Sequence, residues 1–349
     1  MLYYSYILGG EYAQAYKLFA DFPQKLKSDL VKNPKNKLIS LQFYFSNLST
    51  RDPNSLMYND IDGPYNIQGE QTINFGFSVP TLSISWKHSK GFQSFTYALY
   101  AYKDLYRTQT NNEQISETPL YIYNHDFNYI RVHALNDNLN LIWSIAPVLG
   151  YTKEYKTITI ARGRNGSTVS QITQINPIYD FSSAIGFSLN KPHFALTSYI
   201  SGQIYSKIPN IQLTISPTFL PLANTNLFIT PSLLIKYDFY QPQYLTTLNA
   251  GFSIKQKLWI SAEYWYGKIS FFNVDFNNLI FNEDENILQK FGLNITYTFK
   301  KWAVSAIYNL YQKQRFISYQ DPENNLIYKP YSFYSDVFTI GIIHYFNIK

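Results

Sequence analysis

Residues 291–313 form two segments in which apolar and polar side chains alternate, in opposite phase, around a two-residue break. The side chains that recur on one face are apolar: Phe291, Leu293, Ile295, Tyr297 and Phe299 before Lys300-Lys301, and Trp302, Val304, Ala306, Tyr308 and Leu310 after it. Because adjacent residues of a strand point to opposite faces, this pattern predicts a β-hairpin with one apolar face and one small, polar face. The same unit recurs along most of the chain, which predicts a sheet with lipid outside and water inside.

The composition agrees with a membrane-spanning sheet. Of the 349 residues, 46% are hydrophobic and 18% aromatic, yet the mean hydropathy is only −0.22, because aromatic stripes alternate with Asn, Ser, Thr and Gln. No stretch approaches the roughly 18 uncharged apolar residues that a membrane helix needs. The chain has no cysteine, which excludes disulfides and thiolate chemistry. Its net charge of +6 is scattered through turns and loops, which does not favour nucleic-acid binding.

Fourteen strands are predicted by alternation from Leu38 onward. They cover residues 38–48, 71–88, 92–105, 124–134, 138–152, 180–189, 192–206, 211–219, 226–238, 245–254, 257–269, 290–299, 301–313 and 335–346. Short breaks alternate with longer connections, which is the arrangement of an outer-membrane barrel with short periplasmic turns. We therefore expect an all-β, antiparallel, up-and-down transmembrane barrel over residues 37–349, with both barrel ends on the periplasmic side.

Two segments deviate from this simple pattern. The stripe of 71–88 changes phase, which predicts a β-bulge at Pro80-Thr81; a tight turn there would instead give fifteen strands. Within the connection 153–179, two strand-like runs flank Gly163-Arg164-Asn165-Gly166, a hairpin-turn signal. We expect these runs to extend past the membrane as a protruding hairpin.

The N-terminal segment, residues 1–36, is predicted to be helical and separate from the barrel, because apolar residues recur at spacings of three and four over 10–32. Two interpretations stay open: an amphipathic helix that packs under or inside the barrel, or the stump of a repeat domain. Met1–Ala15 is a poor export signal, without a basic start and with Glu11 in the apolar run. We expect the chain to be a mature or truncated piece of a longer product.

The last strand carries a terminal pattern of polar residue, glycine and aromatic residue at Thr339, Gly341 and Phe346. It resembles the signal that the barrel-insertion machinery reads in bacterial outer-membrane β-barrels, with two departures: His344 stands where an apolar residue is usual, and residues 347–349 follow the aromatic. The resemblance implies the outer membrane as location, and outer-membrane lipid and the barrel-assembly machinery as partners. Fourteen strands are similar to the fatty-acid-transporter type and to barrels fused to tetratricopeptide repeats, but no motif selects either.

Candidate lumen-lining residues follow from the phase of each strand. They are polar or charged side chains that alternate with apolar neighbours or share a face with Ser, Thr or Gly: Arg131, His133, Lys236, Asn249, Glu263 and Asn294. A charge that faced lipid at mid-depth would cost roughly 2–4 kcal/mol, which supports placing these residues inside. They could line a permeation path, or they could satisfy one another in a structural network.

Other motifs favour no enzyme, cofactor or metal site. His125-Asp126 cannot form a dyad within a strand, since adjacent residues point to opposite faces. Residues 282–286 are acidic but lack the spacing of a calcium loop, so we expect a solvated loop. Aromatic residues in the predicted loops 106–123 and 314–334 could contact a partner, but are expected to join the interfacial girdle or fold inward as a plug.

The leading functional hypothesis is a channel or translocation component for a solute or an exported polymer or protein. The second is a non-conducting structural or docking barrel of an envelope or secretion assembly, whose loops or N-terminal helix bind other envelope proteins. A barrel hydrolase is a third, less favoured hypothesis. Substrate, direction of transport and oligomeric state do not follow from the pattern.

Overall fold

The fold was analysed in a computed structural model. It describes residues 37–50, 69–88, 91–109, 115–136, 138–161, 167–205, 207–238, 241–255, 257–277, 279–281, 285–320 and 326–346. The helix predicted within residues 1–36 lies outside these ranges. Within them, no helix is long and apolar enough to cross a membrane.

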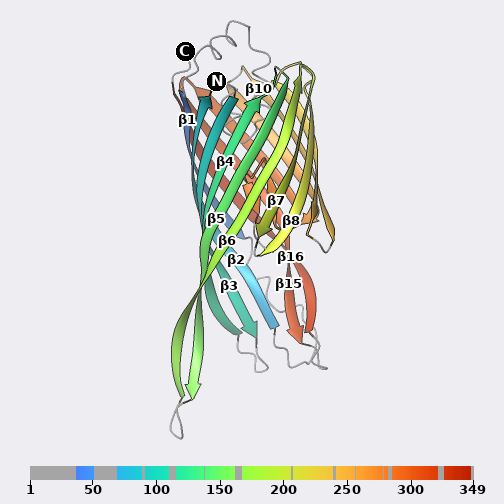
Figure 1. Cartoon of the computed structure of the whole chain (residues 1–349). Coiled ribbons are helices and arrows are strands. Elements are labelled where there is room, and N and C mark those ends of the chain that lie inside the picture. The colour runs from blue at the N-terminus through green and yellow to red at the C-terminus, as the bar shows by residue number, and fades with distance from the viewer. Residues whose placement is uncertain are drawn as a thin grey trace.

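Sixteen strands form in the described part of the chain (Figure 1). Their bounds are β1 (Lys37–Thr50), β2 (Gly69–His88), β3 (Gly91–Gln109), β4 (Ile115–Ala134), β5 (Leu139–Ala161), β6 (Ser167–Lys191), β7 (Phe194–Tyr205), β8 (Ile208–Phe219), β9 (Leu227–Tyr237), β10 (Pro242–Ile254), β11 (Leu258–Ile269), β12 (Phe272–Val274), β13 (Leu279–Phe281), β14 (Asn286–Phe299), β15 (Trp302–Gln320) and β16 (Leu326–Tyr345).

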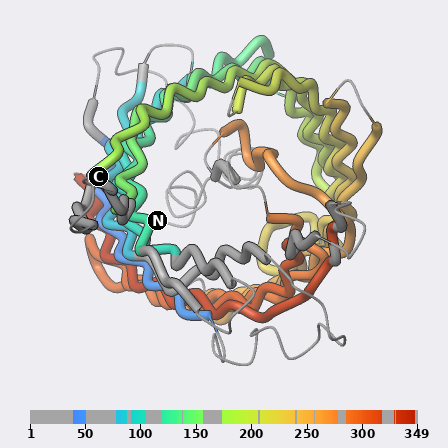
Figure 2. Tube along the Cα trace, turned by 90° about the horizontal axis from the view of Figure 1, so that it is seen from below, coloured from blue at the N-terminus to red at the C-terminus, as the bar shows by residue number. Residues whose placement is uncertain are grey.

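Fourteen of these strands close into one antiparallel barrel, in the order β1-β16-β15-β14-β11-β10-β9-β8-β7-β6-β5-β4-β3-β2. The ring is visible end-on in Figure 2. The first and last strands seal it, with a continuous register from Ser40 opposite Tyr345 to Thr50 opposite Ser335. The start of β1 and the end of β16 therefore lie at the same end as the short turns. The predicted fold class and number of barrel strands are confirmed.

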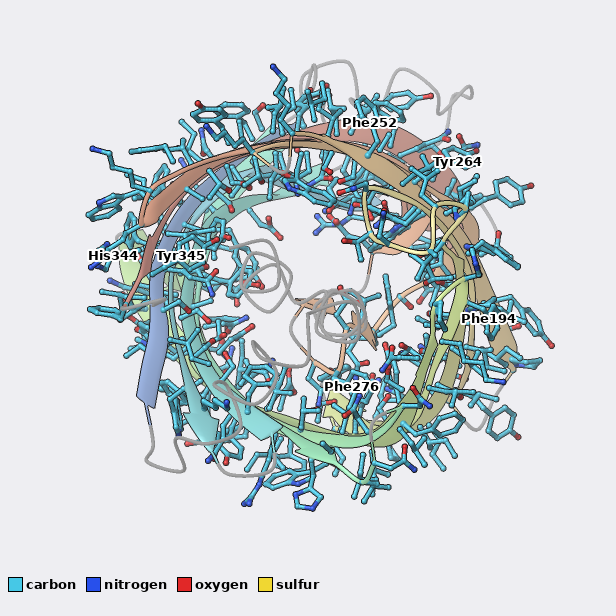
Figure 3. The ribbon with its side chains drawn as sticks, turned by 90° about the horizontal axis from the view of Figure 1, so that it is seen from above. Phe194, Phe252, Tyr264, Phe276, His344 and Tyr345 are labelled. Carbon is cyan, nitrogen blue, oxygen red and sulfur yellow. The ribbon has the colours of Figure 1, made fainter. Side chains whose placement is uncertain are left out.

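The two faces of the wall differ as the alternation predicts. Along β14, Phe291, Ile295, Tyr297 and Phe299 are 41–49% exposed, whereas the intervening Thr296 and Thr298 are buried at 8% and 3%. Figure 3 shows the labelled Phe194, Phe252 and Tyr264 pointing away from the ring, and Tyr345 pointing into it. An apolar outer belt around a largely polar interior is the arrangement of a barrel whose outer solvent is lipid.

Several strands run beyond their predicted ends. The protruding hairpin is confirmed: β5 and β6 pair continuously from Leu139 opposite Leu189 to Ala161 opposite Ser167, and extend far past the barrel (Figure 1). The predicted loops 106–123 and 314–334 are mostly strand, because β3 pairs with β4, and β15 with β16, almost to the tips. At this long-loop end β15 also pairs with β2, through Ser318 and Tyr319.

The position predicted for the β-bulge in the second strand is wrong. Residues 69–88 form one strand, as expected from a bulge and not from a turn, but the register shift lies between Asn74 and Gly76, not at Pro80-Thr81. Val79 is 4% exposed and shares the inner face with Ser83. The apolar stripe changes phase because an apolar side chain lies inside the barrel, not because the strand flips at Pro80.

Candidate functional site

A short hairpin between β11 and β14 folds into the lumen. It consists of β12 and β13, which pair from Phe272 opposite Phe281 to Val274 opposite Leu279. Residues 270–281 are called the inner hairpin below. Its chain lies inside the ring in Figure 2, and Figure 3 shows Phe276 within the barrel. Phe272 and Phe276 are 0% and 2% exposed, so the inner hairpin is packed against the wall.

Two asparagines fasten the inner hairpin to the facing wall. The Asn277 amide donates to Ser144 Oγ at 2.9 Å and its Oδ1 accepts from Ser182 Oγ at 2.6 Å. The Asn273 amide donates to Ser182 Oγ at 2.9 Å, and Gln212 Nε2 donates to the Asn273 carbonyl at 2.7 Å. These wall residues belong to β5, β6 and β8, and β5 is six of fourteen strands away from β11. The inner hairpin therefore reaches across the lumen.

The turn of the inner hairpin has a strained backbone. Asp275, Phe276 and Asn277 have φ angles of 51°, 54° and 67°, and Phe271 has 49°. A left-handed conformation costs a residue other than glycine roughly 1–2 kcal/mol. The polar contacts at the tip, and the Phe276 ring 4.3 Å from the Tyr199 ring, offset this cost. Strain that is held by surrounding contacts is typical of functional segments.

Lys236 holds the start of the inner hairpin. Its Nζ donates to the Ser270 carbonyl at 2.6 Å and lies 3.7 Å from a carboxylate oxygen of Asp238. The Ser270 amide in turn donates to Gln243 Oε1 at 3.2 Å. Lys236 is only 1% exposed. The structure thus places this predicted residue on the inner face, where it binds the backbone of the inner hairpin.

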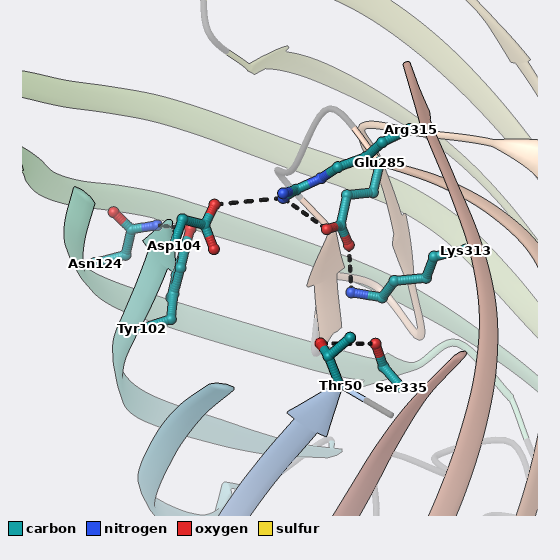
Figure 4. A network of polar contacts seen from close by, with 8 residues as sticks. All are labelled: Thr50, Tyr102, Asp104, Asn124, Glu285, Lys313, Arg315 and Ser335. Carbon is teal, nitrogen blue, oxygen red and sulfur yellow. Dashed lines mark hydrogen bonds and ion pairs between the residues drawn. The ribbon is translucent and has the colours of Figure 1, made fainter. Parts of the chain in front are cut away.

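A cluster of four buried charges holds the segment in which the chain leaves the inner hairpin and rejoins the barrel wall at β14 (Figure 4). The Glu285 carboxylate pairs with Lys313 and, at 2.6 Å, with Arg315 Nη2, which also lies 3.4 Å from Asp104 Oδ2. All four side chains are at most 8% exposed. Burying charges is favourable only when they are paired, so removing one would leave its partners uncompensated. The cluster links β3, β15 and the segment that follows β13.

A second ion pair lies on the inner face of β11 and β14. Lys290 pairs with Glu263, and its Nζ lies 4.0 Å from the centre of the Trp265 ring and 5.6 Å from that of Tyr311. Trp265 Nε1 donates to the other Glu263 oxygen at 3.2 Å. The predicted Glu263 is therefore inside, where it holds a lysine stacked between two rings.

The two predicted asparagines also lie on the inner face. Asn249 stands opposite Glu263 in the β10–β11 ladder. Asn294 Oδ1 accepts hydrogen bonds from Thr296 Oγ1 at 3.2 Å and Ser305 Oγ at 3.1 Å. These contacts are local to the wall.

The placement predicted for Arg131 and His133 is wrong. Their neighbours Ile130 and Val132 are 1% and 0% exposed and point inward, so Arg131 and His133 face outward. Arg131 stands opposite Trp143 near the short-turn end of the barrel. At that depth the outer face meets lipid headgroups, where a cation is tolerated among aromatic side chains.

The three residues of the predicted insertion signal lie along β16 and beyond its end. Thr339 is on the inner face, with Oγ1 2.7 Å from Ser46 Oγ. Gly341 lies under the Tyr44 ring, so that a Cβ on it would be 2.1 Å from Tyr44 Cε1. Phe346 follows β16 and its ring lies 4.8 Å from that of His344. His344, the departure from the usual pattern, points outward in Figure 3.

The remaining candidate motifs are placed as follows. His125 faces outward, with Nδ1 2.9 Å from the Tyr97 hydroxyl, and the neighbouring Asp126 faces inward, which confirms that the two form no dyad. Of the acidic run 282–286, residues 282–284 lie outside the described residues, and Glu285 is in the buried cluster rather than in a solvated loop. Asn273, Asn277 and Lys290 are not among the lumen-lining residues predicted from the sequence.

The inner hairpin was missed because each of its strands has three residues, too few for alternation to be recognised. Aromatic residues that fold inward as a plug were expected in the loops 106–123 and 314–334, and not in this connection. A usable signal was Phe271-Phe272-Asn273 followed by Phe276-Asn277, in which aromatic and amide side chains recur within one connection.

Comparison with known proteins gives a fold and no family. No family model matches the sequence, and no curated protein is significantly similar to it. Among solved structures, the toluene transporter TodX of Pseudomonas putida superposes with a TM-score of 0.56 at 9% identity, covering 92% of this chain and 94% of that one. A FadL homologue of Pseudomonas aeruginosa superposes with a TM-score of 0.51 at 10% identity, covering 93% and 95%. At such identities the likeness shows the fold alone.

A closed barrel of fourteen strands with this fold and an apolar outer belt is a transmembrane β-barrel of the bacterial outer-membrane type. The expected resemblance to bacterial outer-membrane barrels is confirmed at this level, and so is the likeness in fold to the fatty-acid-transporter type that the strand count indicated.

Proposed function

We propose that the protein is a channel for small solutes across the outer membrane and that the inner hairpin sets the width of its path. The observation that carries this proposal is the attachment of the inner hairpin to the far wall through Asn273 and Asn277. A segment bonded at both ends across a lumen narrows it for any solute. This favours small solutes over an exported polymer or folded protein.

The lining suggests the chemistry of the solute. Around the inner hairpin the wall presents Ser, Asn and Gln side chains, paired charges and an apolar cluster that holds Phe272, and near the short turns inward apolar side chains form a ring among polar ones. Members of this apolar ring come from many strands: Phe92, Val132, Ile142, Phe228, Trp259 and Ile343. A path lined by both polar and apolar side chains suits a small amphipathic solute. The similar barrel named as a toluene transporter supports an aromatic body for it.

A non-conducting docking barrel is the second candidate. It is favoured by the paired charges of the lumen, since Lys236, Lys290, Lys313 and Arg315 all have carboxylate partners. Pairing of buried cations such as these four is what a purely structural interior requires. In that case the barrel would bind other envelope proteins through its long hairpins, such as β5–β6.

Planar-bilayer conductance separates the two candidates. The native protein is compared with a variant in which residues 271–282 are replaced by four glycines, which leaves Glu285 and its partners in place. A channel is expected to conduct weakly in the native form and more strongly in the variant, and liposomes should then admit small aromatic alcohols faster. A native protein and a variant that are equally silent would overturn the channel in favour of the docking barrel.

We further infer that the end of β16 binds the barrel-assembly machinery, as its resemblance to the insertion signal implies. Because Phe346 lies just past the last strand, Phe346→Ala should lower the amount of folded barrel in cells without changing unassisted folding in detergent. Equal cellular levels of both forms would contradict this role.

A further inference from the structure

Asp126 is a carboxylate on the inner face of β4 that lacks a partner of opposite charge. Its Oδ1 is buried without a hydrogen bond, and among the described residues no lysine, arginine or histidine pairs with it. The charged group that acts most on it is Asp180 of β6, another carboxylate. Three other carboxylates of the inner face differ, since Glu263, Glu285 and Asp104 each pair with a cation. Buried charges are normally paired in this way, so Asp126 needs an explanation.

Asp126 lies at mid-depth of the barrel. It is five residues along β4 from Arg131, which lies at headgroup depth near the short turns. A strand tilted by about 40° rises roughly 2.5 Å per residue along the membrane normal, so five residues span about 12 Å, half of the apolar band of such barrels. The side chain is half-buried and faces inward. A solute can therefore reach it only from within the lumen.

Asn128, the next residue on the same face of β4, is a second polar side chain without a partner. It is 6% exposed, and neither its Oδ1 nor its Nδ2 has a hydrogen-bond partner in the described part of the chain. Burying an amide without hydrogen bonds is unfavourable. By contrast, Asn124 on the other side of Asp126 donates from Nδ2 to the Tyr102 hydroxyl at 3.3 Å (Figure 4). The unmatched carboxylate and the unmatched amide are thus neighbours on one strand.

An apolar surface lies beside these two side chains. Ala98 of β3 and Val148 of β5 flank the carboxylate in the ladder, and they are 7% and 0% exposed. Val148 packs with Tyr205, and Phe271 of the inner hairpin packs against their cluster. The carboxylate and the amide therefore stand at the edge of an apolar surface, beside the segment that narrows the lumen.

We propose that Asp126 and Asn128 bind the ammonium group of a small protonated amine whose apolar body lies on Ala98 and Val148. This inference rests on the proposed channel and adds the charge of its solute. An ammonium supplies the missing positive charge, and it donates to the carboxylate and to the amide oxygen. Alkylamines are protonated at neutral pH, as lysine is. A metal ion fits less well, because the described residues hold no group of three or more His, Asp or Glu that could ligate one.

The test measures binding in neutral detergent, where no flux is needed. The native protein, Asp126→Asn and Asp336→Asn are titrated by calorimetry with phenethylammonium and with phenethyl alcohol, which has a similar size and no charge. Asp126→Asn keeps the shape of the side chain and removes its charge. Asp336 is the matched control: it is also a half-buried carboxylate of the wall, but it faces outward and accepts a hydrogen bond from the Tyr308 hydroxyl. Heat-modifiable mobility confirms that each barrel is folded.

The native protein and Asp336→Asn should bind the amine roughly thirty-fold more tightly than the alcohol, because a hydrogen bond between charged groups is stronger than one between neutral groups. Asp126→Asn should lose this preference, and Asn128→Ala should bind the amine about five-fold more weakly than the native protein does. Equal binding of the amine and the alcohol by the native protein would overturn the site, whether or not the variants fold. An unchanged preference in Asp126→Asn would overturn it as well.

Conductance in planar bilayers separates this result from the proposed function. A barrel that conducts but does not prefer the amine would overturn the site and leave the channel standing. A barrel that prefers the amine but stays silent, even without its inner hairpin, would overturn the channel and leave the site standing.

Discussion

Removing the two asparagine side chains at the tip of the inner hairpin should release it from the far wall. In Asn273→Ala/Asn277→Ala, four hydrogen bonds of 3.2 Å or shorter disappear between these side chains and wall residues: Asn277 with Ser144 and Ser182, and Asn273 with Ser182 and Gln212. The backbone contacts to Gln212 and Lys236 remain. The barrel wall itself is unchanged.

The size of the effect can be worked from these bonds. A neutral hydrogen bond contributes a net of about 1 kcal/mol, so the four bonds together hold the tip by roughly 4 kcal/mol. Each 1.4 kcal/mol is a factor of ten, which gives a shift of about a thousand-fold toward the released state. The left-handed residues Asp275 and Phe276 add to the release, because their strain is relieved once the tip is free.

Single-channel recording in planar bilayers measures the release. The variant should show a larger mean conductance and rapid transitions between two levels, whereas the native channel should stay at the lower level. Asn226→Ala is a matched control, since this asparagine also bonds a serine side chain, Ser253, but in a short-turn region away from the inner hairpin. A double variant with the conductance and noise of the native protein would refute the role of the tip contacts.

Three further changes probe the wall. Glu285→Gln should lower the free energy of unfolding by about 3 kcal/mol, since Lys313 loses its buried partner, as measured by urea titration in lipid vesicles. Gly341→Ala should destabilise the barrel by roughly 1–3 kcal/mol through overlap with Tyr44, and adding Tyr44→Ala should cost less than the sum of the two changes. Leu149→Arg places a charge on the lipid face at mid-depth and should cost about 2–4 kcal/mol; no loss would contradict the outward assignment.

The strands could be predicted because lipid imposes a simple rule on one face. Along β14 and β15, residues such as Phe291 and Trp302 must be apolar, and a water-filled or polar interior allows Ser and Thr between them. The pattern repeats for each crossing, so fourteen crossings could be counted. The strand ends were less predictable, because β5 and β6 continue outside the membrane, where neither face has to be apolar.

Which face of a strand points into the barrel could not be assigned where the inward side chains are themselves apolar. In β4 the inward Ile130 and Val132 belong to the apolar ring near the short turns, and the outward Arg131 and His133 lie at headgroup depth. The rule that charges face inward holds at mid-depth and fails at the interface. The bulge in β2 was predicted at the wrong position for the same reason, because the apolar Val79 lies inside the barrel.

The candidate site was predicted only in part. Lys236, Glu263 and Asn294 are inside, as their phases indicate, because each lies on a long and regular strand. Their partners lie elsewhere in the chain: Lys236 binds the inner hairpin, and Glu263 binds Lys290 on another strand. Such contacts depend on closure of the barrel and on the path of one connection, which local periodicity does not encode.

A reversible cross-link tests most directly whether the inner hairpin controls the path through the barrel. The chain has no cysteine, so Ser182→Cys/Asn277→Cys introduces a single pair at a native contact of 2.6 Å. In the oxidised form the tip is tied to β6, and we predict a steady low conductance with no transitions. Reduction should raise the mean conductance and restore fluctuations, because the hydrogen bonds of Asn277 are absent. The same conductance before and after reduction, with the cross-link verified by mass spectrometry, would contradict the account.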